Sequence, residues 1–319
     1  MEFITILIAL AVEQYYKDIA QYRQFGWFAA YCDWIQQKSA SLVSMTPSAS
    51  GSVAILILLV PLVILVATAE SIFAGMGSFF SFVFGIVILI YSLGPKDITI
   101  QAEKYLVSLS AGDNEDALRN ANAFFAGHHS EPEIAGSPAT TAGIMKGGIL
   151  LAFSNRILAV LFWFIILGPV GALLYRLTAL LLERFAGGYF GAGSELGASS
   201  ESEAEDESDA EFKSAIQRLY TILGWVPARL SVLVFALAGS FTDTLLCWKC
   251  AAEFFNKNND ELIVESGLHA LKIDVDASGD ENETTTDIND LEQVLALVKW
   301  SLIIVITVIS LMTIVGWIY

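Results

Sequence analysis

The stretch that decides the fold is VKWSLIIVITVISLMTIVGWIY at residues 298–319, in which Lys299 is the single charged side chain. A helix needs about 20 apolar residues to cross the roughly 30 Å hydrocarbon core of a bilayer, and this stretch is long enough. Trp300 near its start and Trp317 near its end lie where interfacial aromatic residues are expected. We therefore predict a C-terminal transmembrane helix over residues 295–319.

A second decisive stretch is VAILILLVPLVILVA at residues 53–67, which carries no charge. Another apolar run follows at residues 71–93, and Glu70 is the only charge between the two. Pro61 is compatible with a spanning helix, because neighbouring groups can satisfy the backbone that a proline leaves unpaired. These runs predict a transmembrane hairpin over residues 53–93.

The composition agrees with a membrane protein. The chain has 319 residues, of which 55% are hydrophobic, and its mean hydropathy of +0.60 lies well above that of an ordinary soluble domain. Its net charge is −17, concentrated in acidic clusters at residues 195–211 and 274–292. Such acidity excludes a nucleic-acid backbone as partner, since that recognition needs a basic surface. Three cysteines give no disulfide framework.

The apolar segment LFWFIILGPVGALLYRL at residues 161–177 allows two readings. Gly168 and Pro169 interrupt it, so residues 157–182 form either one kinked spanning helix or two half-helices of a re-entrant hairpin. Arg184 and further basic residues follow this segment. Because basic residues stay on the cytoplasmic side, this excess favours the re-entrant reading.

The fold class predicted is all-α: a polytopic helical membrane protein with three or four spans and cytoplasmic helical segments. Residues 97–127 are expected to form a helix pair, with Gly112 ending the first helix and Asp113 capping the second. Pro227 is expected to separate helices at 212–223 and 228–256. The regions expected along the chain are amphipathic N-terminal helices at 1–50, the hairpin at 53–93, a polar helical region at 97–148, the spanning or re-entrant segment at 149–186, an acidic linker at 187–211, a helical region at 212–272, an acidic loop at 273–294 and the C-terminal span at 295–319.

Two short motifs are read as structural. The C-W-K-C sequence at residues 247–250 has the spacing of a redox dithiol or half a zinc site, but no second pair of ligands accompanies it. The loop at residues 274–285 approaches a calcium-binding pattern, yet Thr285 stands where a bidentate glutamate is required. No phosphate-binding loop and no nucleophile motif is present. We predict no catalytic residue, no metal site and no cofactor.

The candidate ligand-binding residues are two arginines beside apolar runs, each next to an aromatic residue. Tyr175 precedes Arg176, and Trp225 begins the sequence WVPARL that contains Arg229. Guanidinium groups bind phosphate or carboxylate groups in a bidentate manner. The structural alternative is that both arginines extend to the membrane interface or pair with Glu183.

The same motifs resemble the AmpE family of inner-membrane proteins, described as modulators of β-lactamase induction. The resemblance rests on L-F-W at 161–163, G-P at 168–169, Y-R at 175–176, W-V-P-A-R-L at 225–230 and A-L-x-G at 236–239. It extends over almost the whole chain. The residues that we expect to maintain the shared frame are Trp163, Gly168, Pro169 and Pro227.

AmpE in turn is similar to the CobD/CbiB family of cobalamin-biosynthesis amide ligases. That family carries an E-N-x-x-D run before its P-L-F-W and an N-T-L-D run after its Y-R. The corresponding positions here are Leu151, Ala152, Asn155, Ala179 and Leu182. An ATP-dependent ligase needs carboxylates to hold magnesium on phosphates, so the resemblance implies a frame without the ligase chemistry.

The resemblance implies a multi-pass protein of the bacterial inner membrane that regulates β-lactamase induction or the response to peptidoglycan recycling. It is expected to act by binding and not as an enzyme. Its expected partners are the lipid bilayer, an anionic ligand such as a muropeptide, and a protein of peptidoglycan recycling, with no nucleic acid. Two alternatives stay open: a CobD/CbiB-like ligase or transferase with an altered substrate, and a permease for an anionic small molecule.

Overall fold

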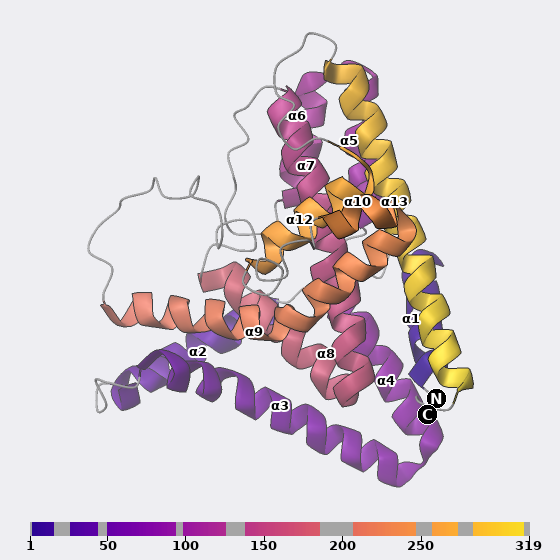
Figure 1. Ribbon diagram of the computed structural model, residues 1–319. Coiled ribbons are helices and arrows are strands. Elements are labelled where there is room, and N and C mark those ends of the chain that lie inside the picture. The colour runs from indigo at the N-terminus through magenta and orange to yellow at the C-terminus, as the bar shows by residue number, and fades with distance from the viewer. Residues whose placement is uncertain are drawn as a thin grey trace. The chain divides into compact units, whose positions relative to one another are not determined.

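A computed structural model describes residues 2–15, 26–43, 50–93, 98–125, 138–185, 207–246, 257–273 and 283–315, and the structural statements below concern these ranges. Every regular element within them is a helix (Figure 1), which confirms the all-α class. The C-W-K-C motif, the acidic linker up to residue 206 and residues 274–282 of the calcium-like loop lie outside the described residues.

The described helices fall into two compact units, with boundaries in sequence after residues 95, 159 and 223. The first unit contains α1 to α4, α8 and the N-terminal part of α9. The second contains α5 to α7, a π-helical segment η2, the rest of α9, α10, α12 and α13. The bounds are α1 Glu2–Tyr15, α2 Gly26–Val43, α3 Ser50–Met76, α4 Ser78–Leu93, α5 Ile98–Ser110, α6 Asn114–Phe125, α7 Pro138–Ala152, η2 Phe153–Leu158, α8 Ala159–Phe185, α9 Glu207–Ala238, α10 Phe241–Leu246, α12 Asn259–Ala270 and α13 Glu283–Ile314.

Four helical stretches in the described ranges are long and apolar enough to cross a bilayer: Ser52–Met76, Thr141–Phe185, Ala210–Ala238 and Asp287–Ile314. Large apolar side chains remain exposed on them, such as Leu65 of α3 and Ile314 of α13. In water such exposure would be costly, whereas lipid accepts it without penalty. The chain is therefore an all-α membrane protein, as its sequence predicts.

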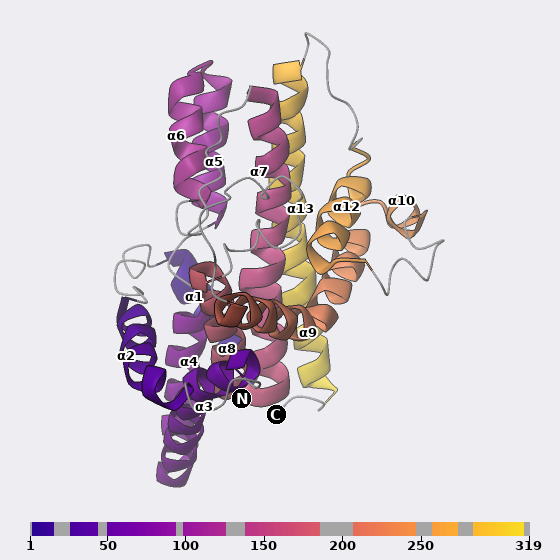
Figure 2. The same ribbon diagram turned by 90° about the vertical axis from the view of Figure 1, so that its left-hand side faces the viewer.

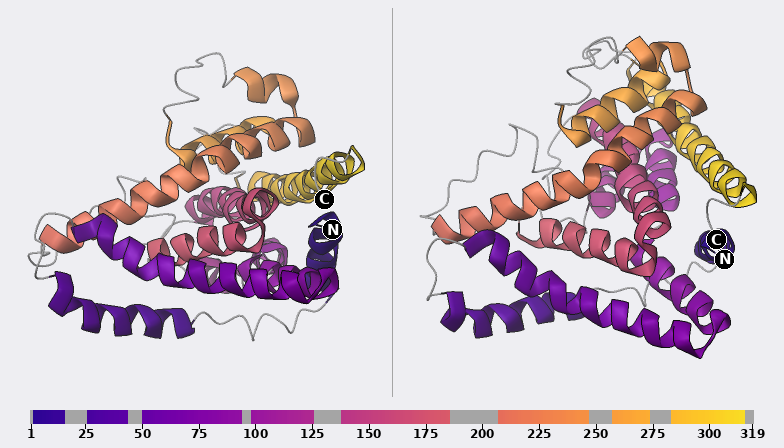
Figure 3. Two further views of the ribbon diagram at one scale, coloured as in Figure 1. Left: turned by 90° about the horizontal axis from the view of Figure 1, so that it is seen from below. Right: turned by 60° about the horizontal axis from the view of Figure 1, so that its bottom comes forward.

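In the first unit, α3 and α4 form the expected hairpin, joined at Gly77 (Figure 3). Gly77 has a φ of 129°, a conformation that a side chain would strain, so glycine suits the turn. The rings of Phe73 and Phe84 stack across the hairpin with centroids 5.1 Å apart. Pro61 lies inside α3, as expected.

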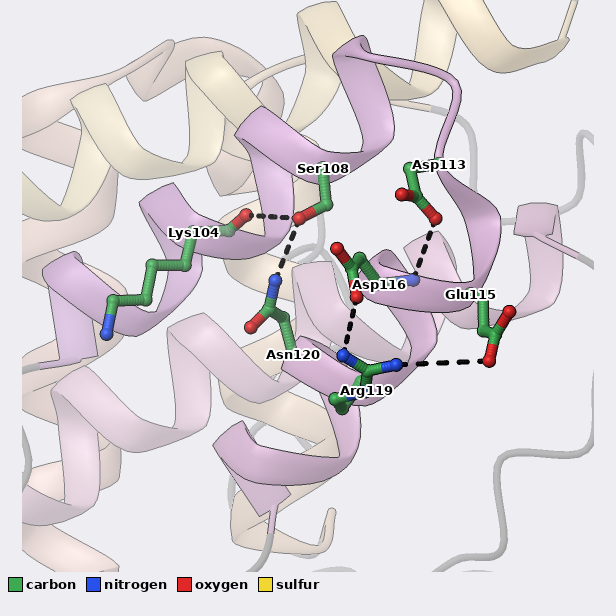
Figure 4. Close-up of polar contacts among 7 residues, drawn as sticks. All are labelled: Lys104, Ser108, Asp113, Glu115, Asp116, Arg119 and Asn120. Atoms are coloured by element: carbon green, nitrogen blue, oxygen red, sulfur yellow. Dashed lines mark hydrogen bonds and ion pairs between the residues drawn. The ribbon is translucent and has the colours of Figure 1, made fainter.

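In the second unit, α5 and α6 form the predicted helix pair (Figure 4). Gly112 lies in the left-handed region, with a φ of 73°. The Asp113 carboxylate accepts a hydrogen bond from the backbone N–H of Asp116 at 3.0 Å, which confirms the expected N-cap. Asn120 donates to the hydroxyl of Ser108 at 2.8 Å and so links the two helices.

Helices α7 and α13 run side by side in the second unit (Figure 2). The α13 helix begins at Glu283, earlier than the expected start at 295, so much of the predicted acidic loop is its first turns. Lys146 of α7 explains this extension, because its Nζ lies 2.9 Å from carboxylate oxygens of both Asp287 and Asp290. All three side chains are at most 15% exposed.

The expectation of separate helices at 212–223 and 228–256 was wrong, because α9 continues through Pro227 to Ala238. A proline has no N–H and leaves the carbonyl four residues earlier, here that of Leu223, without its helical donor. The indole Nε1 of Trp163 donates to this carbonyl at 3.0 Å and replaces the lost bond. The helix ends at Gly239, where a Cβ would lie 2.6 Å from the Ala270 carbonyl oxygen.

Candidate functional site

The first part of the predicted site lies on α8, in the first unit. Tyr175 and Arg176 are 1% and 3% exposed. The Tyr175 hydroxyl donates to that of Tyr220 at 3.4 Å, and the two rings lie 5.9 Å apart between centroids. Tyr175 thus links α8 to α9, and its neighbour Arg176 is buried as well.

A sharp break in α8 precedes these residues. Gly168 has φ 66° and ψ −154°, outside the helical region, and Pro169 follows it. A Cβ on Gly171 would lie 2.4 Å from the carbonyl oxygen of Trp163. Eight residues of a straight helix would separate these positions by about 12 Å. The chain therefore turns back at Gly168, and α8 consists of two helical halves.

The second part of the predicted site lies on α9, in the second unit. The Arg229 guanidinium carbon lies 4.6 Å from the centre of the Trp225 ring, within the range of a cation–π contact. Its Nη1 donates to the side-chain oxygen of Asn259 and to the Trp225 carbonyl, the latter at 3.3 Å. Its Nη2 donates to the Lys257 carbonyl at 3.4 Å. Arg229 therefore links helix α9 to the start of α12 and to the segment just before it.

The predicted ligand-binding residues thus divide between the two units. Tyr175 and Arg176 belong to the first, and Trp225 and Arg229 to the second. Trp163, Gly168 and Pro169 surround the α8 break, and Pro227 is the proline that α9 accommodates. Glu183, the proposed ion-pair partner, is also buried, at 6% exposure.

The structure adds polar residues that sequence reasoning did not assign to the site. They begin with η2, a single π-helical turn in which Ser154, Asn155 and Arg156 are all buried. Such turns occur frequently at functional sites. The Ser154 hydroxyl lies 2.6 Å from that of Ser231 on α9 and links η2 to that helix.

Asn155 faces Asp260 in the first turn of α12. Burial raises the pKa of the Asp260 carboxyl to about 7, and the Glu261 charge raises it too, while a hydrogen bond from the Asn155 side chain lowers it. Asn155 Nδ2 is buried without a hydrogen bond of standard geometry to any described residue, so this contact is a loose one. Asn155 occupies one of the positions at which the ligase family has a carboxylate. Asn155 in place of a carboxylate was the one sequence signal for the polar cluster of η2, α9 and α12.

The chemistry available in the second unit is therefore that of buried donors and of one carboxyl whose pKa is raised. Arg156, Arg229 and Asn155 contribute donors, and Asp260 contributes the carboxyl. Within the described ranges, no group of three histidine, cysteine or acidic side chains is arranged to hold a metal ion. These residues are suited to polar recognition or to stabilising the packing of η2, α9 and α12.

These observations define the class: an all-α membrane protein with a broken apolar helix and buried polar clusters. The chain belongs to the family described as "Regulatory signalling modulator protein AmpE", which it matches over residues 1–319. The predicted resemblance to that family is confirmed.

Two curated relatives support the more distant resemblance as well. The chain is 28% identical over 189 residues to the cobalamin biosynthesis protein CobD of Stutzerimonas stutzeri (strain A1501), which covers 59% of this chain and 55% of that protein. It is 26% identical over 189 residues to CobD of Chromobacterium violaceum, and the match covers 59% of this chain and 54% of that protein. The chain thus spans about half the length of the curated relatives it matches. No solved structure matches it.

Proposed function

We propose that this protein is a regulatory protein of the bacterial inner membrane that modulates β-lactamase induction or the response to peptidoglycan recycling. The observation that carries the proposal is the match to the AmpE family over residues 1–319. The protein acts through a bound ligand or partner and not through catalysis. Support for this second point comes from Leu151, Ala152 and Asn155, which stand where the ligase family has its E-N-x-x-D run.

The test is deletion of the gene in a bacterium with an inducible β-lactamase, followed by measurement of enzyme activity with and without a β-lactam inducer. We expect the deletion to shift the induced activity several-fold and the wild-type gene to restore it. Complementation with Arg229→Lys, which keeps the charge but loses the fork of donors to Asn259 and Lys257, should restore it only in part. Unchanged induction after deletion would contradict the proposal.

The partner is an anionic small molecule, for which anhydro-muropeptide is the probe. Purified protein in detergent is heated with anhydro-muropeptide, with ATP–magnesium or with cobyric acid. A ligand at 100 times its Kd adds about 2.7 kcal/mol of stability. Stabilisation by anhydro-muropeptide, lost in Arg176→Ala or Arg229→Ala, supports ligand binding. The absence of any shift would leave a protein partner as the means of regulation.

A CobD-like ligase or transferase is the second candidate, favoured by the 28% identity over 189 residues. Stabilisation by ATP–magnesium together with cobyric acid, and rescue of a bacterium that lacks CobD, would establish it. A permease for an anionic molecule is the third candidate. Broken apolar helices are typical of transporters, and α8 has such a break at Gly168. Uptake of labelled muropeptide into proteoliposomes would establish that function.

A further inference from the structure

The α3–α4 hairpin contains a single charged residue, Glu70, and the structure shows what that residue faces. Its carboxylate oxygen Oε1 lies 3.3 Å from the position that a Cβ on Gly168 would take. The carboxylate of α3 is thus directed at the break in α8. Both residues belong to the first unit.

Glu70 lies within the apolar stretch of α3, and a span centred on the bilayer would place it in the hydrocarbon core. The apolar stretch of α3 runs from Ser52 to Met76, so its midpoint is residue 64. At 1.5 Å per residue, Glu70 lies about 9 Å from that midpoint, inside the roughly 15 Å half-thickness of the hydrocarbon core. Charged groups at such depth are expensive, and those that occur pair with other groups or mark ion pathways and proton relays.

The break in α8 also leaves a backbone oxygen without its helical donor. Pro169 has no N–H, so the carbonyl of Ile165 loses its helical donor. Broken membrane helices use such carbonyls, together with acidic side chains, to coordinate Na⁺ or to exchange protons. Glycine is required at position 168, since a side chain there would be strained at φ 66° and would press on Glu70.

The surroundings contain no described cation that would neutralise Glu70. Helix α4 packs against the break, since Pro169 Cγ lies 4.0 Å from the position that a Cβ on Gly85 would take. No residue of α4 is charged. Thr5 of α1 lies at the same place, and α1 bears charge only at Glu2 and Glu13, both acidic. On α8 the nearest basic residue is Arg176, seven residues and about 10 Å beyond Pro169.

We propose that Glu70 and the Gly168–Pro169 break form a binding site for a small cation, either H⁺ or Na⁺. The site lies in the first unit and is independent of the proposed regulatory function. It also bears on the permease alternative, because a carboxylate at the start of the second half of α8 repels an anion there. The competing structural account is that Glu70 only accepts hydrogen bonds from the N–H groups at the start of that half.

The test is labelling of the full-length protein in detergent with dicyclohexylcarbodiimide, an apolar reagent that modifies protonated carboxyl groups. Labelling at Glu70 is quantified by mass spectrometry between pH 5.5 and 8.5, in NaCl or in choline chloride. We expect more labelling at lower pH. If Na⁺ binds with a Kd of about 10 mM, 100 mM NaCl should lower labelling about tenfold by mass action. A response to pH alone identifies H⁺ as the cation, and a response to both identifies Na⁺ in competition with H⁺.

Three variants complete the design. Glu70→Gln should abolish the labelling, and Glu103→Gln should leave it unchanged, because Glu103 is an exposed carboxylate paired with Lys299 at 3.1 Å in the second unit. Gly168→Ala retains the carboxylate but disturbs the break, so it should weaken Na⁺ protection. Labelling of Glu70 that Na⁺ does not reduce, and whose pH dependence is the same in Gly168→Ala, would overturn the proposal and leave Glu70 a structural acceptor.

Discussion

Replacement of Lys146 by methionine should destabilise the protein strongly. Lys146 Nζ lies 2.9 Å from an oxygen of Asp287 and 2.9 Å from one of Asp290, and the three side chains are 11%, 12% and 15% exposed. The substitution retains most of the apolar stem but leaves two carboxylates buried together without their cation. Removing one partner of a buried ion pair costs about 3–5 kcal/mol, far more than the net contribution of the intact pair.

The assay is thermal unfolding of the purified protein in detergent. At about 2 °C per kcal/mol for a chain of this size, the Tm should fall by roughly 6–10 °C. The matched control is Lys104→Met on α5, whose side chain is exposed, and its effect should stay within about 0.5 kcal/mol. The triple variant in which Lys146→Met is joined by Asp287→Asn and Asp290→Asn should recover much of the loss, because no buried charge is left. If Lys146→Met and Lys104→Met had equal Tm values, the reasoning would be refuted.

Three further predictions concern local contacts. Trp163→Phe should lower the free energy of unfolding by about 1–3 kcal/mol, because it leaves the Leu223 carbonyl unsatisfied. Thermal unfolding should show a smaller loss in a Pro227→Ala background, where the backbone N–H of residue 227 is the donor. Equal losses in the two backgrounds would contradict the coupling. Burial raises the pKa of Asp260 from 3.8 to about 7, so between about pH 4 and 7 the folded protein retains a proton that the unfolded chain loses, and stability falls as the pH rises. Asp260→Asn should therefore raise the Tm by an amount that grows from about pH 4 to 7 and is constant above about pH 7. A gain in Tm that does not depend on pH would refute this origin. Gly239→Ala should destabilise the protein by about 1–3 kcal/mol, since its Cβ would lie 2.6 Å from the Ala270 carbonyl oxygen. The control is Gly143→Ala in α7, whose Cβ would have no atom within 4 Å and which should not lower the Tm in the same assay.

Features encoded by local sequence could be predicted well. The lengths of the apolar runs identify α3 and α13 as helices long enough to cross a bilayer, since the length required is fixed by bilayer thickness. Gly112 and Asp113 identify the turn between α5 and α6, because a left-handed turn and an N-cap are both properties of a few adjacent residues. Gly168 and Pro169 likewise identify the position of the break, although not the direction the chain takes after it.

Features that depend on distant residues could not be predicted. Pro227 indicates a helix start when read alone, and only the indole of Trp163, sixty residues earlier in the chain, makes a continuous helix favourable there. Asp260 looks like an ordinary residue of a first helical turn, because the burial that raises its pKa comes from the packing of the folded chain. In the same way, the acidic residues Asp287 and Asp290 resemble a solvated loop unless Lys146 is known to lie between them.

The hydrogen bond between Trp163 and Leu223 also has a consequence for biogenesis. While α9 is alone in the lipid, the Leu223 carbonyl has no donor, and an unsatisfied carbonyl in hydrocarbon costs several kcal/mol. Trp163 precedes Leu223 by sixty residues, so the donor of this hydrogen bond is synthesised before its acceptor. A variant without this indole would therefore insert an α9 whose unpaired carbonyl has no donor waiting for it in the chain already made.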